Sequence, residues 1–207
     1  MGLSQFREVI VKLMHRIRPF LISTAVLVGL VGCGGSSTGS GDSGGGISPQ
    51  VMADALHAIM EADRTVYAER VVNRLQDEEQ VIQASEHWLD ERTLPLPAQM
   101  FRMGAELAAD MTDAFTYALL SAWPINSSNA PRTPMETEGL AAVAADPSTA
   151  FYGTETLGDR DYFTAVYADV AVSQACVTCH NNHLDSPRTD FELNDVMGGI
   201  VIRIPLN

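Results

Sequence analysis

The pattern of hydrophobic and polar positions divides the chain into a helical first part and a strand-rich last part. From residue 48 onward, apolar residues recur with the spacing of one helix face at Met52, Leu56, Ile59, Val66, Val71 and Leu75. Ser48 followed by Pro49 is typical of a helix start. The pattern therefore predicts a long first helix, interrupted at residues 77–80.

The rest of the pattern predicts shorter elements. Further helices are expected at 81–92, at 97–113 after a proline-rich break, and at 135–145, with a loop at 124–134. Alternating apolar residues predict strands at 115–123, 162–172 and 197–204. Helices that come first and strands that come last indicate an α+β fold with an antiparallel sheet, in one domain over residues 48–207.

The N-terminus resembles an export signal. Arg7, Lys12, Arg16 and Arg18 precede an apolar run at 20–31, which is too short to span a bilayer. Residues 30–33 (Leu-Val-Gly-Cys) resemble a bacterial lipobox. We therefore expect a lipoprotein signal peptide at 1–32 and a lipid on Cys33, with an uncleaved membrane anchor as the alternative.

Residues 33–47 are rich in glycine and serine, which predicts a flexible tether between the lipidated cysteine and the domain. The domain is then expected on the periplasmic side of a bacterial membrane, with the outer membrane as the expected anchor point. Without the signal peptide, the chain has nine arginines and twenty-five acidic residues, which gives a net charge of −16. This charge argues against a nucleic-acid partner and is compatible with a basic redox partner protein.

The chemistry of the chain is concentrated at Cys176-Val177-Thr178-Cys179-His180. Cys-x-x-Cys-His is the attachment pattern of a c-type haem, because two thiols at this spacing reach the two vinyl groups of one porphyrin. The adjacent histidine can then ligate the iron. The remaining cysteine is Cys33, so this motif predicts one covalent haem c held by Cys176, Cys179 and His180, with none left for a structural disulfide.

Two other uses of the cysteine pair stay open. A disulfide-exchange site is possible, because Cys-x-x-Cys lowers a thiol pKa, although the rest of a thioredoxin-like pattern is missing. A zinc site could use the two cysteines with His180 or His183, but the sequence shows no obvious fourth ligand.

Several segments resemble an extracytoplasmic family of PAS-like c-type haem domains, which includes sensor input modules and stand-alone cytochromes. The matching segments are residues 64–67 (Arg-Thr-Val-Tyr), 97–102 (Pro-Ala-Gln-Met-Phe-Arg), 121–131 (Ser-Ala-Trp-Pro-Ile-Asn-Ser-Ser-Asn-Ala-Pro), Tyr167, and 194–200 (Asn-Asp-Val-Met-Gly-Gly-Ile). The resemblance implies a PAS-like sheet. Val166, Asp169 and Val170 depart from the family pattern, and the chain has no spare cysteine for the second axial ligand of the cyanobacterial type.

The resemblance also implies site residues. Met100 is the first choice for the sixth iron ligand, and a thioether ligand raises the reduction potential. His57, His87, His183 and an open position stay as alternatives, and Met100 could equally be a packing residue. Arg102 is the candidate partner of the haem propionates. Tyr67, Tyr117 and Tyr167 are candidates to line the pocket, or else core aromatics.

We expect one-electron transfer as the function. The alternative is a haem-based gas or redox sensor, which would need a separate partner chain because no kinase or chemoreceptor output follows Ile204. An enzyme is not expected, since no acid–base pair or nucleophile constellation is recognisable in the sequence.

Overall fold

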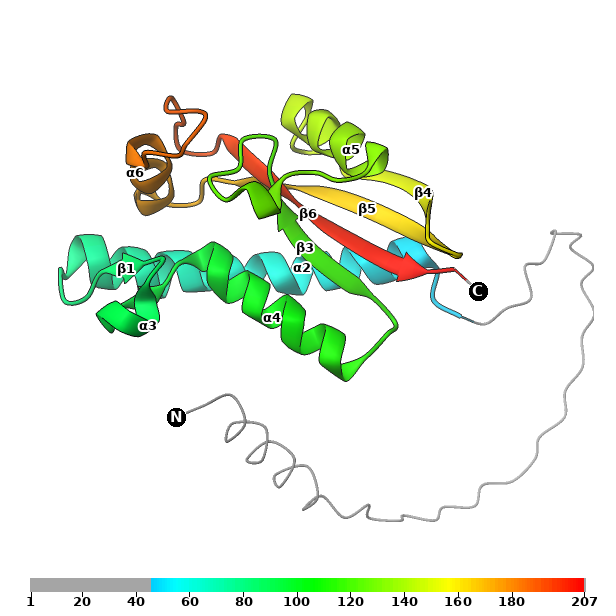
Figure 1. Cartoon of the computed structure of the whole chain (residues 1–207), viewed down its shortest axis with the longest axis horizontal. Helices are drawn as coiled ribbons and strands as arrows, with labels where there is room; N and C mark the ends of the chain where they lie inside the picture. The colour runs from blue at the N-terminus through cyan, green and yellow to red at the C-terminus, as the bar shows by residue number, and fades with distance from the viewer. Residues whose placement is uncertain (1–45, 207) are drawn as a thin grey trace, which may run out of the picture. The chain divides into compact units, whose positions relative to one another are not determined.

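The computed structural model describes residues 46–206 (Figure 1). The predicted signal peptide, the lipid site at Cys33 and most of the predicted tether lie outside the described residues. Within 46–206, no helix is both long enough and apolar enough to cross a membrane.

A four-stranded antiparallel sheet is the centre of the fold. Its strands, in the spatial order β3-β6-β5-β4, are β3 (Thr116–Leu120), β6 (Val196–Pro205), β5 (Arg160–Val170) and β4 (Phe151–Leu157). The last strand of the chain, β6, therefore lies inside the sheet between β3 and β5. The predicted α+β architecture with an antiparallel sheet is confirmed.

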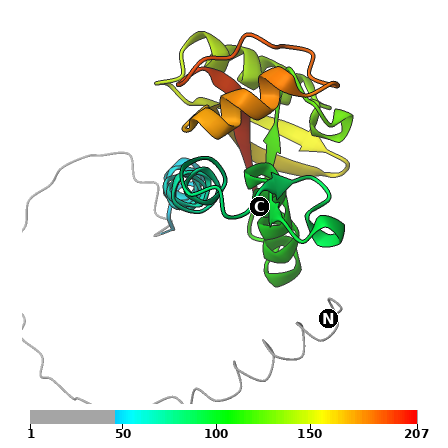
Figure 2. The same ribbon diagram turned by 90° about the vertical axis from the view of Figure 1, so that its left-hand side faces the viewer.

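Helices cover both faces of this sheet. The long helix α2 (Pro49–Val66), its π-helical continuation η1 (Tyr67–Glu78), and α4 (Pro97–Met111) lie on one side, and α5 (Pro134–Ala145) lies on the other (Figures 1 and 2). The remaining short elements are β1 (Ala84–Ser85), α3 (Trp88–Glu91), β2 (Leu94–Pro95), η2 (Ser127–Asn129) and α6 (Gln174–Asn182).

The first helix starts as its sequence predicts. The Oγ atom of Ser48 accepts a hydrogen bond of 3.3 Å from the backbone N–H of Val51, and Pro49 occupies the first turn. The helical run ends at Glu78, inside the predicted interruption. Gln80 then adopts a φ of 52°, which turns the chain away from the helix axis.

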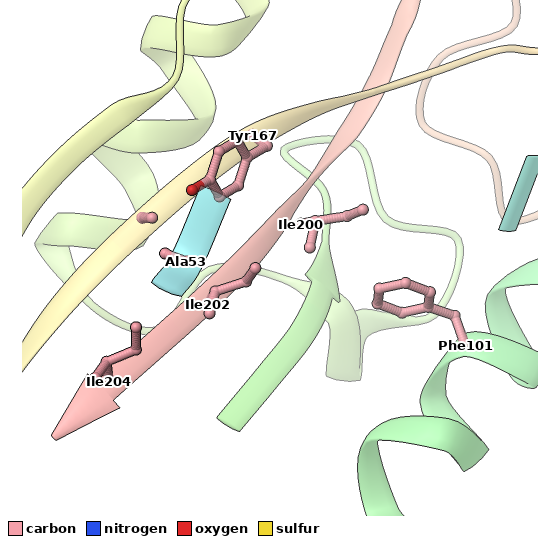
Figure 3. Close-up of a cluster of buried hydrophobic side chains, with 7 residues drawn as sticks. Ala53, Phe101, Tyr167, Ile200, Ile202 and Ile204 are labelled. Carbon is pink, nitrogen blue, oxygen red and sulfur yellow. The ribbon is translucent and has the colours of Figure 1, made fainter. Parts of the chain in front are cut away.

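The alternation of β6 divides the core into two layers. Ile200 and Ile202 face α2 and α4, where they pack with Ala53 and Phe101 (Figure 3). Val201 faces the other way and packs beneath α5 in a cluster with Leu120, Leu140, Val143 and Val166. Both faces of β6 are therefore buried, which explains its nearly continuous apolar sequence.

The sequence analysis was wrong about one helix and missed two elements, the strand β4 and the helix α6. The helix expected at 81–92 is reduced to α3, because Ala84 and Ser85 pair with Leu94 and Pro95 as short parallel strands instead. The strand β4 was missed. It is an edge strand whose exposed positions carry a tyrosine and two threonines, so its apolar alternation is weak.

Helix α5 packs so closely on the sheet that one of its positions excludes a side chain. A Cβ added at Gly139 would lie 2.5 Å from Cγ2 and 2.9 Å from Cβ of Val166, which is fully buried. The glycine therefore permits the close approach of α5 to β5, at a cost in helix propensity.

We predict that Gly139→Ala lowers the free energy of unfolding by about 1–3 kcal/mol, because overpacking outweighs the gain in helix propensity. The matched control is Gly104→Ala in α4, where the nearest atom is the movable hydroxyl of Tyr117 at 2.8 Å. Urea denaturation of both variants measures the difference. Equal or greater stability of Gly139→Ala than of the native chain would contradict this packing.

Candidate functional site

Helix α6 presents the cysteine and histidine residues of the motif together. The chain leaves β5, passes Ser173, and enters α6 at Gln174. Cys176, Cys179 and His180 stand at positions i, i+3 and i+4, which lie on one face of a helix. Both cysteines are free thiols, Cys176 half-buried and Cys179 exposed. The structure thus brings the predicted attachment residues to one surface.

The imidazole of His180 is held in an apolar setting. Its ring meets Phe191 edge to face at a centroid distance of 5.8 Å, and its Nδ1 atom is buried without a hydrogen-bond partner in the described structure. Burial, followed by the positive charges of Arg64 and His183, lowers the pKa of His180. A neutral imidazole with a free lone pair is the form that ligates metals.

The thiol of Cys179 lies in a setting that disfavours its ionised form. Burial, then the neighbouring Cys176 and Glu86, raise the pKa of Cys179. The lowered pKa of an exchange site belongs to the attacking thiol, which is normally the first of the two cysteines, so this shift leaves the disulfide-exchange alternative open. For the zinc alternative, residues 46–206 contain no cluster of three or more His, Cys, Asp and Glu side chains that could hold a metal ion.

The loop after α6 folds back and fixes the helix. Asn181 donates from Nδ2 to the backbone oxygen of Phe191, and the backbone N–H of Phe191 donates to Oδ1 of Asn181, both at 2.9 Å. The guanidinium of Arg188 lies over the rings of Phe191 and Trp123, at 4.2 and 5.1 Å from their centroids. Phe191 is thereby held against His180.

A buried ion pair joins α2 to the end of β5, four residues before α6 begins. Nη1 of Arg64 lies 2.8 Å from Oδ1 of Asp169, and Nη2 donates to Oδ2 at 2.9 Å. Arg64 is 9% exposed and Asp169 is 8% exposed, and the Nε atom of Arg64 has no partner in the described structure. A small cavity adjoins the pair. Asp169 therefore compensates the charge that Arg64 brings toward His180.

Tyr167 lies deeper in the core than the motif. Its hydroxyl donates to Oδ1 of Asp54 at 2.7 Å, as does the hydroxyl of Tyr152, and its ring stacks on His57 at 3.9 Å. Burial and the hydrogen bond to Asp54 raise the pKa of Tyr167. Burial lowers the pKa of His57, against the opposing effects of Glu61 and Asp54. Tyr167 thus has a packing role here, and its role in a haem pocket stays a prediction.

Met100 and Arg102 both lie on α4 but differ in exposure. Met100 is half-buried in the first turn of α4. The element η1 contacts both α4 and α6, so it lies next to the helix of Met100 and to the helix of the motif. Arg102 has 63% of its side chain exposed and lies 3.8 Å from Glu106. The contact of Arg102 with the haem propionates stays a prediction.

The other two candidate histidines lie near α3 and α6. His87 directly precedes α3, is 66% exposed, and lies 3.3 Å from Oε1 of Glu86. His183 ends α6, and its Nδ1 atom accepts a hydrogen bond from the backbone N–H of Asp185. Tyr67 donates to the backbone oxygen of Pro95 and so connects η1 to β2.

A family model described as Tll0287-like matches residues 48–205. The chain belongs to the Tll0287-like family. A solved structure titled "Crystal structure of the cyanobacterial heme-protein Tll0287" is similar to this chain at 14% sequence identity and a TM-score of 0.49. The similarity covers 78% of this chain and 98% of that one. No curated protein matches the chain.

The residues that support the cysteine and histidine motif on α6 were not recognised from the sequence. Asp169 was noted only as a departure, and Arg64 only as part of a matching segment. An aspartate within an apolar strand has to find a partner, which is a usable signal. Nothing local identifies Arg64, which lies 105 positions away. The contact between Asn181 and Phe191 is likewise not recognisable from the sequence, because it forms only when the loop after α6 folds back.

We predict that Asp169→Ala lowers the free energy of unfolding by about 3–5 kcal/mol, because it leaves a buried guanidinium unpaired. Replacing both partners, as Arg64→Met with Asp169→Leu, is expected to restore most of that stability. Arg102→Gln, which removes an exposed arginine, is the control and is expected to have little effect. Urea denaturation measures all three. An Asp169→Ala variant as stable as the control would show that the pair contributes nothing.

Proposed function

We propose that this domain binds one haem covalently through Cys176, Cys179 and His180, and that it transfers single electrons. We propose further that a lipid on Cys33 tethers it to the periplasmic side of a bacterial membrane, with the outer membrane expected. The observation that supports haem attachment best is the placement of two free thiols and the His180 imidazole on one face of α6. The haem-protein title of the structural neighbour agrees with it.

The thiols fit the attachment chemistry. Each S–H would add across one vinyl C=C bond of the porphyrin, forming a C–S bond at one carbon while the hydrogen goes to the other. No oxidant is consumed, so two free thiols are the required starting state. A disulfide between the two cysteines would block this reaction.

His180 would supply the iron ligand next to the second thioether. With Nδ1 buried, Nε2 is the nitrogen left to ligate the metal. The T-shaped contact with Phe191 restricts ring rotation, and the clamp at Asn181 holds Phe191 in place. When bound, a haem supplies an iron that changes oxidation state by one electron.

The surface charge supports a carrier that docks with a basic partner. The predicted mature chain has a net charge of −16, and complementary charge accelerates the encounter of redox partners. We propose no enzymatic turnover, because the sequence has no recognisable acid–base pair or nucleophile constellation.

We predict a sharp low-spin α band in the dithionite-reduced protein that carbon monoxide does not shift, because a carrier needs two protein ligands on the iron. The measurement is an absorption spectrum of the matured full chain with and without the gas. A pyridine haemochrome spectrum of the same sample tests covalent attachment separately. No covalent haem would overturn the whole proposal, whereas a shift under carbon monoxide would replace electron transfer with gas sensing.

We propose Met100 as the sixth ligand, since α4 and α6 share η1 as a neighbour. Met100→Ala is then expected to lower the reduction potential and to let carbon monoxide bind, because the thioether favours the reduced iron. The matched control is Met103→Ala, which removes a half-buried methionine one turn later in α4. Identical potentials for the native chain and Met100→Ala would refute this ligand.

A further inference from the structure

The outer face of α2 is apolar although no other part of residues 46–206 covers it. In Figure 2, where α2 is seen end-on, no other described element lies on the side of α2 that faces away from the sheet. Val51, Ile59 and Val66 are 57%, 62% and 57% exposed. Between them lie three exposed alanines, Ala55, Ala58 and Ala62.

This face departs from the usual pattern of a surface helix. Met52, Leu56 and Met60 on the opposite side already pack against the core, so the outer side should be polar. Instead, the stripe formed by Val51, Ala55, Ala58, Ile59, Ala62 and Val66 contains no charged or hydrogen-bonding side chain. A helix that is apolar on both sides is normally covered on both sides.

The order of residues in this stripe is symmetric about its midpoint. If a second α2 runs antiparallel, Val51 lies opposite Val66, Ala55 opposite Ala62, and Ala58 opposite Ile59, because each pair is equidistant from the point between residues 58 and 59. A two-fold interface requires this kind of self-complementary surface. We propose that two copies of this chain associate through the outer faces of their α2 helices, in an antiparallel two-fold pair.

The side chains suit close helix packing. Alanines at three central positions let two helix axes approach to about 8 Å, the near limit of interaxial distances. The valines at both ends and Ile59 beside the midpoint then cover the alanine strip. The exposed apolar area of both copies is buried in one step.

Charge favours a second copy over a basic partner. The acidic residues near the stripe, Asp54, Glu61 and Asp63, lie at its flanks, and the predicted mature chain is strongly acidic overall. Two acidic copies meet with least repulsion through a face without charge. A basic redox protein would find no carboxylate on this stripe.

The size of the stripe predicts a weak dimer. Sixteen helical residues span about 24 Å, and a strip about 10 Å wide is well below the roughly 800 Å² per partner of a stable interface. We therefore expect an equilibrium between monomer and dimer that depends on concentration.

Disulfide trapping in the full chain tests both the pair and its direction. The double variant Ala55→Cys with Ala62→Cys is expected to form a covalent dimer under mild oxidation, because residue 55 of one copy faces residue 62 of the other. Each single variant is expected to stay monomeric, since equivalent residues lie about 10 Å apart along the axis, beyond the reach of a disulfide. Non-reducing electrophoresis measures the result.

The controls separate this contact from random oxidation. The native chain gives the background of Cys176 and Cys179, and Ala109→Cys places a thiol on the exposed side of α4. Adding Ala58→Glu to the double variant is expected to abolish the dimer while the circular dichroism spectrum is retained. Dimers from each single variant would establish a parallel pair instead, and no dimer above background would overturn the proposal.

Discussion

The buried pair of Arg64 and Asp169 is the interaction on which the site depends most. It closes a contact between the first helix and the end of β5, over 105 positions of sequence. Burying an arginine is unfavourable unless a carboxylate compensates it, so neither residue can be placed there without the other. Because α6 begins only five residues after Asp169, this pair also fixes where the cysteine and histidine motif starts.

The second support of the motif comes from the opposite end of α6. Two hydrogen bonds join Asn181 to Phe191, and the guanidinium of Arg188 lies over the Phe191 ring. Together they hold the loop that follows α6 against the end of that helix. Phe191 then both excludes water and positions the His180 ring. An ion pair before α6 and an aromatic cluster after it thus hold the helix that presents the thiols. The orientation of its cysteine and histidine face is thereby fixed.

The sequence predicted what depends on local periodicity and on spacing. The long helix with its Ser48 cap follows from a 3.6-residue repeat, and the choice of Cys176, Cys179 and His180 follows from the Cys-x-x-Cys-His spacing, although the helix α6 that carries them was not predicted. Strand β4 was missed because an edge strand needs little apolar sequence. The partners Arg64 and Asn181 could not be predicted, because each is selected by a tertiary contact and not by its neighbours in sequence.

The contacts on the inner side of helix α2 keep its outer stripe exposed among residues 46–206. Its inner face supplies Met52, Ala53 and Leu56 to the core and Arg64 to the ion pair, so rotating the helix to bury Ile59 would expose those residues and break the pair. Losing the buried ion pair alone would cost several kcal/mol. The orientation of α2 is therefore fixed by its inner side, and the apolar outer side is left to contact another molecule.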